Sequence, residues 1–139
     1  MSRIHAAFAA LLLMLSTPAA QADQADAAQI RQIIEAQTAA ITAGDGHTAF
    51  GYATPMIQRK FGSSATFMMM VETGYPILIS PRSFEVESVD VQGDEAAAAA
   101  HLVARDGHAY KAIYPLKRQA NGVWKIDGCY IQKADGVGA

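Results

Sequence analysis

The chain has 139 residues, 51% of them hydrophobic and 17% charged, and its 11 basic and 13 acidic side chains give a formal net charge of −2. No block of like charge is present, which excludes nucleic acid and an anionic membrane surface as expected partners. Cys129 is the only cysteine, so an internal disulfide is excluded and the packed core must provide the stability.

The first 22 residues predict a secretory signal peptide. Residues 1–5 give a positive start, an apolar run centred on Leu11-Leu12-Leu13 follows, and Ala20-Gln21-Ala22 has the small-x-small form of a cleavage site. The apolar run is too short to span a bilayer. We therefore expect cleavage after Ala22, a periplasmic or secreted location, a single domain over residues 23–139, and no membrane span after cleavage.

Four helices are predicted in the first half of the chain, over residues 27–43, 47–53, 55–61 and 64–74. Asp26 is placed as the N-cap of the first helix, in which isoleucines and Gln37 recur at helical spacing on one face. Thr54 followed by Pro55 is typical of an N-cap and a first helical position. Glycines then indicate where the helices end.

The second half predicts a short edge strand over residues 77–79 and four long strands over residues 83–92, 95–104, 108–118 and 123–133. Gly93-Asp94, Asp106-Gly107 and Asn121-Gly122 are typical of tight hairpin turns. The run from Ala96 to Ala100 favours a helix by intrinsic propensity, but strands flank it and a hairpin turn follows, so we expect a strand. Helices followed by an antiparallel meander predict an α+β fold, in which the helices cover one face of the sheet.

Side chains alternate between the two faces of a sheet, so the turn lengths decide which residues share a face. We expect two-residue turns at Asp106-Gly107 and Asn121-Gly122. One face then holds His101, Val103, Tyr110, Tyr114, Leu116, Lys125, Asp127, Cys129 and Ile131. The other holds Leu102, Lys111, Ile113, Lys117, Trp124, Ile126 and Tyr130. Both faces are largely apolar, so we expect helices on one and a second subunit, in a homodimer through the sheet, on the other.

Several short stretches carry a resemblance to a known fold. They are Ala53-Thr54-Pro55-Met56-Ile57, Phe61-Gly62, Phe67 with Met70-Val71, Tyr75-Pro76, Pro81-Arg82 and Trp124-Lys125-Ile126-Asp127-Gly128-Cys129. In this order the chain resembles the nuclear-transport-factor-2-like fold, and within it a family of small secreted bacterial proteins known only as a domain of unknown function. The resemblance implies helices on a curved antiparallel sheet of four long strands (a half-open cone), a Gram-negative envelope location and self-association. It implies no reaction, because the fold hosts isomerases, dehydratases and plain ligand binders.

Asp127, Tyr114 and His101 are the candidate catalytic residues, because the expected register places them on one face. A carboxylate, a phenol and an imidazole around an apolar cavity suit proton transfer next to a carbonyl, with Asp127 as base and Tyr114 donating to the oxyanion. The alternatives are a noncatalytic pocket lined by Tyr110, Tyr114 and Asp127, or a paired surface carboxylate beside a core tyrosine. Arg82 is a candidate for binding an anionic ligand at the mouth of the cone, or for fixing the turn between helices and sheet.

Neither a metal nor a cofactor is expected. After cleavage the histidines are His47, His101 and His108, and none has an established ligand spacing. No serine lies in a nucleophile-elbow motif, and Gly44-Asp45-Gly46 lacks the flanks of a phosphate-binding loop.

The alanine strand leaves volume that Phe67, Met68 and Met70, or a bound ligand, would fill. The leading interpretation is therefore a secreted periplasmic module that binds a small apolar ligand or a protein partner without catalysis. One alternative is a cofactor-free isomerase or lyase that uses Asp127. The other is a structural module that dimerises through the sheet. Cys129 lies in an apolar run and is expected to be buried.

Overall fold

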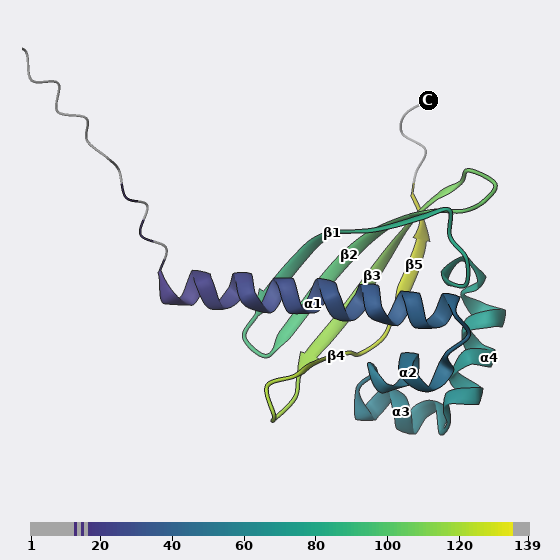
Figure 1. Cartoon of the computed structure of the whole chain (residues 1–139), viewed down its shortest axis with the longest axis horizontal. Helices are drawn as coiled ribbons and strands as arrows, with labels where there is room; N and C mark the ends of the chain where they lie inside the picture. Colours follow the sequence, from purple (N-terminus) through teal and green to yellow (C-terminus); the bar gives the residue numbers. More distant parts are fainter. Residues whose placement is uncertain (1–12, 14, 16, 135–139) are drawn as a thin grey trace, which may run out of the picture.

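The computed structural model describes residues 13, 15 and 17–134, so most of the predicted signal peptide lies outside the described residues. Helices come first and a curved antiparallel sheet follows, which confirms the predicted α+β fold (Figure 1). The helices are α1 (Pro18–Thr42), α2 (Gly46–Gly51), α3 (Pro55–Phe61), α4 (Ser64–Gly74) and the 3₁₀ turn η1 (Pro76–Leu78). The strands are β1 (Ser83–Gln92), β2 (Glu95–Val103), β3 (Ala109–Arg118), β4 (Trp124–Ile126) and β5 (Tyr130–Lys133).

The three shorter α-helices begin at capping side chains. Asp45, Thr54 and Ser63 each accept a hydrogen bond from the backbone N–H three residues further on, at the starts of α2, α3 and α4. Proline at the first position of α3 needs no N–H partner there, and its fixed φ suits a helix. The predicted start of α3 at Thr54-Pro55 is confirmed.

The long helix α1 begins nine residues before the predicted position. Thr17 caps it by accepting a hydrogen bond from the Ala20 N–H, and Pro18 is its first residue. Asp26, predicted as the N-cap, lies inside the helix and has a different role, described below. The helix passes through Ala22, where cleavage is predicted, and residues 18–25 are exposed.

The sheet has the order β1-β2-β3-β4, and β5 also pairs with β3. The prediction of one strand over residues 123–133 is wrong, because residues 127–129 are not in strand conformation and separate β4 from β5. The predicted edge strand over residues 77–79 is also wrong, and η1 occupies this segment. Pro76 opens η1, since its fixed φ suits a helical turn and it has no N–H to donate to a sheet.

The hairpin loops between β2, β3 and β4 each contain three residues, not two. They are residues 105–107 and 120–122, and each ends in a glycine with positive φ, +89° and +86°. This is the common three-residue loop in which a left-handed residue closes a tight turn. An odd loop length shifts the register by one, so Leu102 pairs with Tyr110.

This shift corrects the predicted faces of the sheet. The side chains that face the helices include Leu102, Tyr110, Ala112, Tyr114, Leu116, Trp124, Ile126 and Ile131. His101, Val103 and Lys125 lie on the outer face instead, together with Lys111, Ile113, Lys117 and Tyr130 as predicted. His101 pairs with Glu85 and Lys111 there, so its predicted place beside Tyr114 is wrong.

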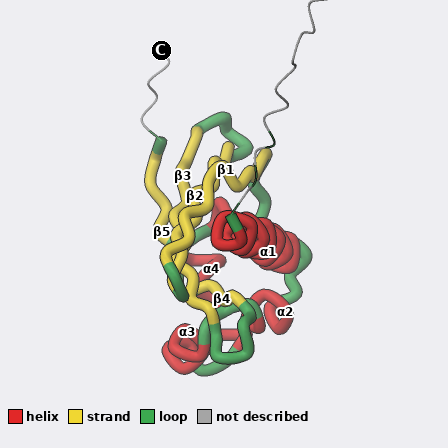
Figure 2. The backbone as a smooth tube through the Cα atoms, turned by 90° about the vertical axis from the view of Figure 1, so that its left-hand side faces the viewer, coloured by secondary structure: helices red, strands yellow, loops and turns green. Residues whose placement is uncertain are grey.

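The inner face of the sheet curves around α1. The helix contacts the edge strands β1 and β4, and Figure 2 shows it lying along one side of the sheet. Small side chains at alternate positions of β2, Ala96 to Ala100, leave space in this concave face, and the ring of Tyr114 lies directly opposite Ala98. Tyr114 is 1% exposed and packs edge-on against Phe84, with ring centroids 6.5 Å apart.

Phe67, Met68 and Met70 of α4, or a bound ligand, were expected to fill this space, and Phe67 belongs to the same core cluster as the β2 alanines, with Met68 and Met70 packed against it. Phe67 lies against Phe50 and Phe61, with ring centroids 5.5 and 5.9 Å away. Met68 lies against Gly46 of α2, so closely that a Cβ added to this glycine would be 2.5 Å from the Met68 Cγ. The core beside the alanines therefore combines Tyr114 of β3 with side chains of the helices.

Polar contacts fix α1 at both edges of the sheet. At β1, a bulge between Val86 and Ser88 leaves carbonyl groups free, and the Arg31 guanidinium donates to the carbonyls of Val86, at 2.5 Å, and Glu87, at 3.4 Å. The bulge thus provides acceptors that an unbroken ladder would have used.

At the other edge, Asp26 joins α1 to the ends of β3 and β4. Its carboxylate accepts hydrogen bonds from the Trp124 indole at 3.1 Å and from the Arg118 guanidinium at 3.2 Å. Arg118 also pairs with Asp94 at 3.1 Å and lies 4.8 Å over the Trp124 ring. One carboxylate therefore fixes α1 to the β3–β4 hairpin. Through Arg118 and Asp94 it also links α1 to the β1–β2 hairpin.

The outer face of the sheet carries small and apolar side chains in its central part. Ala97, Ala99, Ile113 and Pro115 lie there, beside Tyr130, which is 64% exposed. Among the described elements, no helix covers this face (Figure 2).

We predict that Asp26→Ala lowers the free energy of unfolding by about 2 kcal/mol, because it removes charge-assisted hydrogen bonds to two side chains and leaves both without this partner. Urea denaturation measures the change. Asp23→Ala is the matched control, since Asp23 is an exposed acid of the same helix. Equal effects of the two substitutions would contradict the assigned role of Asp26.

Candidate functional site

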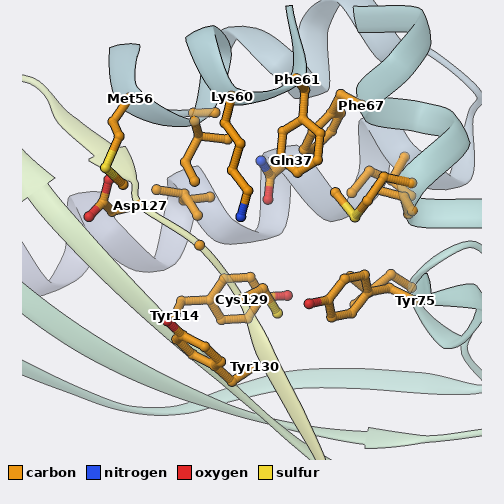
Figure 3. A pocket seen from close by; sticks show the side chains of 18 residues that line it. Gln37, Met56, Lys60, Phe61, Phe67, Tyr75, Tyr114, Asp127, Cys129 and Tyr130 are labelled. Atoms are coloured by element: carbon orange, nitrogen blue, oxygen red, sulfur yellow. The ribbon is translucent and has the colours of Figure 1, made fainter.

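A pocket of about 340 Å³ lies between the helices and the broken edge of the sheet (Figure 3). Its walls come from α1, α3, α4, η1, β3, β4, the chain that joins β4 to β5, and the first residue of β5. Apolar side chains dominate the walls, chiefly Ile41, Met56, Ile57, Phe61, Phe67, Met70 and Val71. The side chains with polar atoms among them are Gln37, Lys60, Tyr75, Tyr114, Asp127, Cys129 and Tyr130.

The break between β4 and β5 shapes one wall of the pocket. Gly128 has φ of +141°, a conformation that favours glycine, and the pairing with β3 shifts by one residue across the break. The end of β4 is hydrogen-bonded to the residue before α3, because the Thr54 N–H donates to the Ile126 carbonyl at 2.9 Å. The sheet and α3 thereby enclose the pocket between them.

Asp127 lies at one end of the pocket and has two partners. The Thr54 hydroxyl donates to one carboxylate oxygen at 2.6 Å, and the Lys117 ammonium lies 3.7 Å from the other. The Asp127 side chain is 12% exposed, so it does not lie in bulk solvent. Figure 3 places it beside Met56, away from the hydroxyl of Tyr114.

Tyr114, which is buried, and Cys129, which is half-buried and not fully buried as expected, lie together on the sheet side of the pocket. In Figure 3 the Tyr114 hydroxyl lies beside Cys129 and is directed toward the part of the pocket that Tyr75 lines. Burial raises the pKa of the Cys129 thiol to about 12, and a hydrogen bond to Tyr114 opposes this only in part. Burial, and then the neighbouring Cys129, raise the pKa of Tyr114 well above its usual range, while a hydrogen bond with Thr38 opposes the shift. Both groups are therefore protonated at neutral pH.

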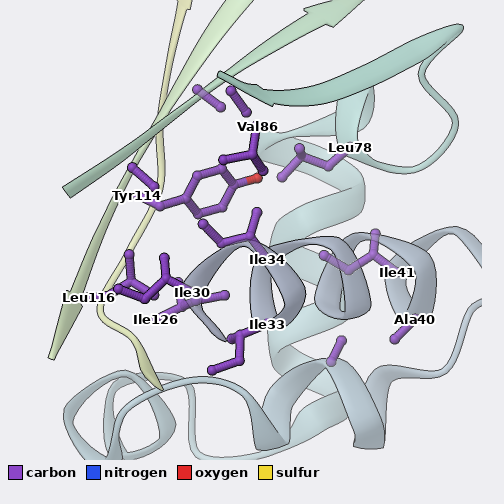
Figure 4. Packing of buried hydrophobic residues seen from close by; sticks show 14 of the residues in the cluster. Ile30, Ile33, Ile34, Ala40, Ile41, Leu78, Val86, Tyr114, Leu116 and Ile126 are labelled. Atoms are coloured by element: carbon purple, nitrogen blue, oxygen red, sulfur yellow. The ribbon is translucent and has the colours of Figure 1, made fainter. Parts of the chain in front are cut away.

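The far side of Tyr114 belongs to the apolar core. Figure 4 shows its ring reaching from β3 toward Ile34, Val86 and Leu78, which are all buried. Tyr114 therefore belongs to the core and also lines the pocket, and its role in binding stays a prediction.

The structure brings together only some of the predicted site residues. Tyr114 and Asp127 line the pocket. Tyr110 faces the same side of the sheet, half-buried beside Leu102, but it is outside the lining. His101 is on the outer face, and Arg82 is exposed, with its backbone N–H donating to the Val103 carbonyl. The prediction of one cluster formed by Asp127, Tyr114 and His101 is therefore wrong.

Sequence reasoning missed Lys60 and Tyr75 as pocket residues. A signal existed for Gln37, a polar residue on the isoleucine face of α1, where its amide donates to the Ala49 carbonyl at 3.2 Å. Lys60 has no such signal, since a lysine near the end of a helix is ordinary. Its place in the pocket follows only from how α3 lies over the break after β4.

The described residues contain neither a metal-binding cluster nor a helix that could span a membrane. No group of three or more His, Cys, Asp or Glu side chains among them lies close enough together to hold a metal ion. In the same part of the chain, no helix combines the length and the apolar character needed to cross a membrane.

Helices over a strongly curved sheet, with a pocket between them, define the nuclear-transport-factor-2-like (NTF2-like) class of proteins. The chain belongs to the family described as Domain of unknown function (DUF4864), whose profile matches residues 23–139. Among curated proteins, none matches the sequence significantly. The predicted resemblance to this fold and to a family of unknown function is confirmed.

Two solved structures are similar in fold. One is an NTF2-like protein of unknown function from Silicibacter pomeroyi, 19% identical, with 82% of this chain and 98% of that chain covered and a TM-score of 0.55. The other, from Shewanella frigidimarina, is named only provisionally as a ketosteroid isomerase, and it is 13% identical, with 73% and 92% covered and a TM-score of 0.50. At these identities the likeness concerns the fold alone.

We predict that stability falls as pH rises from about 8.5, the ordinary pKa of a cysteine, toward the folded-state pKa of about 12. In this window the unfolded thiol releases its proton and the folded thiol keeps it, so the folded state binds more protons. The slope from Cys129 is at most about 1.4 kcal/mol per pH unit. Urea denaturation at several alkaline pH values, for the wild type and Cys129→Ala, measures it. Equal slopes in the two proteins below pH of about 10, where an ordinary tyrosine begins to titrate, would contradict the burial of this thiol.

Proposed function

We propose that this chain is an exported module that binds a small, largely apolar molecule in the pocket without catalysis. The observation that carries the proposal is the pocket itself, about 340 Å³ in volume, with apolar walls and a few convergent polar groups. Small-molecule sites in proteins have this composition, and this volume is near the lower end of their range.

The way the pocket is built supports the proposal. Its walls come mainly from α1, α3, α4 and three strands, so the site does not depend on a long surface loop. Phe67 and Val71 are buried in the hydrophobic core as well as lining the pocket, which holds this wall in place. A site with pre-formed walls loses little conformational entropy when a ligand binds.

We predict that Met70→Trp reduces binding of apolar ligands, because the larger side chain occupies the pocket that Met70 lines. Met69→Trp is the matched control, since Met69 is the adjacent residue on α4, is 63% exposed and is not part of the lining. Thermal shift with an envelope extract and a lipid panel measures binding. If no extract or lipid stabilises the wild type, or if Met70→Trp is stabilised as much as the wild type, this pocket is not the binding site.

Export is the second part of the proposal, supported by the residues around Ala22. The exposed turns of α1 before Asp26 contribute little to the core, and Asp26 is the first side chain tied to the sheet. The family match also begins at residue 23. Cleavage after Ala22 therefore leaves the anchoring residue in place.

We predict that the protein recovered from a Gram-negative envelope begins at Asp23, since Ala20-Gln21-Ala22 is a small-x-small cleavage site. Intact-mass spectrometry of the periplasmic fraction measures the N-terminus. Recovery of the uncleaved chain from the cytoplasm alone would overturn the localisation.

A cofactor-free isomerase or lyase is the second candidate, favoured by the place of Asp127 in the pocket wall. Asp127 would act as base and the Tyr114 hydroxyl would stabilise an oxyanion, but the two groups lie apart and Asp127 already has Thr54 and Lys117 as partners. The binding role therefore ranks first. Exchange of the α-protons of a panel of apolar ketones into D₂O tests the candidate. Exchange that Asp127→Asn abolishes would favour it, and no exchange above the buffer rate would remove it.

A homodimer through the sheet is the third candidate, favoured by the small and apolar side chains of the outer face. Ala97, Ala99 and Ile113 lie there beside the exposed Tyr130. Sedimentation velocity over a range of concentrations tests it, with Tyr130→Lys as the disrupting variant. A monomer at every concentration would reject the dimer.

A further inference from the structure

The pocket lining contains one acidic and one basic side chain, Asp127 and Lys60, and their charges are compensated differently. Asp127 has a cation, Lys117, 3.7 Å from one oxygen and the Thr54 hydroxyl 2.6 Å from the other. Among the residues that the structure describes, no acidic side chain forms an ion pair with Lys60. The uncompensated charge of the pocket is therefore positive, and it is carried by Lys60.

The ammonium group of Lys60 lies beside the pocket. Lys60 lies in the last turn of α3, and Figure 3 shows its side chain extending from the helix toward the pocket, near Gln37. Its ammonium group lies 5.6 Å from the centre of the Phe61 ring, which is itself part of the wall. Lys60 is exposed overall, so it stands where the pocket meets solvent.

We propose that the ligand is a small carboxylic acid with an apolar body. The body lies against the Phe61, Phe67 and Met70 side of the pocket, and the carboxylate accepts a hydrogen bond from Lys60 at the mouth. This inference rests on the proposed binding function and names the chemical class of its ligand.

The chemistry of the groups favours this class over a neutral or cationic ligand. An ammonium group has three N–H donors, so Lys60 can bind a carboxylate even while it contacts a protein acceptor. A cationic head would be repelled there, and a neutral head would forgo the charge-assisted hydrogen bond. Because Lys60 is exposed and screened by water, its contribution is modest, and we expect about a tenfold effect on affinity.

Calorimetric titration of the full mature chain tests the proposal with two acids of different shape, decanoate and naphthoate. Each is compared with its neutral alcohol, decanol or naphthalenemethanol, below the concentration at which micelles form. We expect at least one acid to bind about tenfold more tightly than its alcohol. The flexible and the rigid probe distinguish a fatty acid from an aromatic acid.

Lys60→Gln is the test variant, and Arg59→Gln is the matched control because Arg59 is an exposed cation on the same helix outside the lining. We expect Lys60→Gln to weaken the acid about tenfold and to leave the alcohol unchanged, with Arg59→Gln like the wild type. Equal binding of acid and alcohol, or equal effects of the two variants, would overturn the ligand class and leave the binding function standing. No binding of any of the four probes, together with no stabilisation by envelope extract, would overturn both.

Discussion

The carboxylate of Asp26 is the contact on which the arrangement of this protein depends. It fixes α1 to Trp124 and Arg118 at one edge of the sheet, while Arg31 fixes the same helix to the bulge in β1 at the other. A helix held at both edges requires a sheet that curves around it. Hydrogen bonds to charged groups are worth more than neutral ones, and they set a specific geometry that apolar packing alone leaves open.

The curved sheet then explains both the core and the pocket. The alanines of β2 are small enough for the Tyr114 ring to lie across the concave face, where it completes the core around Ile30 and Ile34. Beyond Tyr114 the last strand is interrupted at residues 127–129, between β4 and β5. Helices α3 and α4 cover this interruption and form walls of the pocket. The pocket is thus a consequence of where the packing of α1 ends. Its polar residues belong to the elements that meet there, so Lys60 and Asp127 share one cavity although they come from distant parts of the chain.

Local signals in the sequence predicted the elements well where one residue type decides the structure. Thr54-Pro55 marks the start of α3 because it combines a capping hydroxyl with a proline that needs no N–H partner. Prediction failed for the sheet faces, where loops of three residues replaced the expected two and moved His101 away from Tyr114. Asp106-Gly107 and Asn121-Gly122 suit either loop length. A single added loop residue changes which face of the sheet each residue of the following strand occupies relative to the strand before it.

The sequence by itself determined the class of fold, the order of the four α-helices and of the first three strands, and the family, because periodicity, caps and turn residues act over a few neighbours. It also indicated two of the pocket residues, Tyr114 and Asp127. Only the tertiary structure decided that Lys60 joins them, that His101 and Arg82 do not, and that Asp26 ties α1 to the sheet instead of capping it. These outcomes depend on loop length, on the break at Gly128 and on contacts between residues far apart in the chain, which local patterns do not encode.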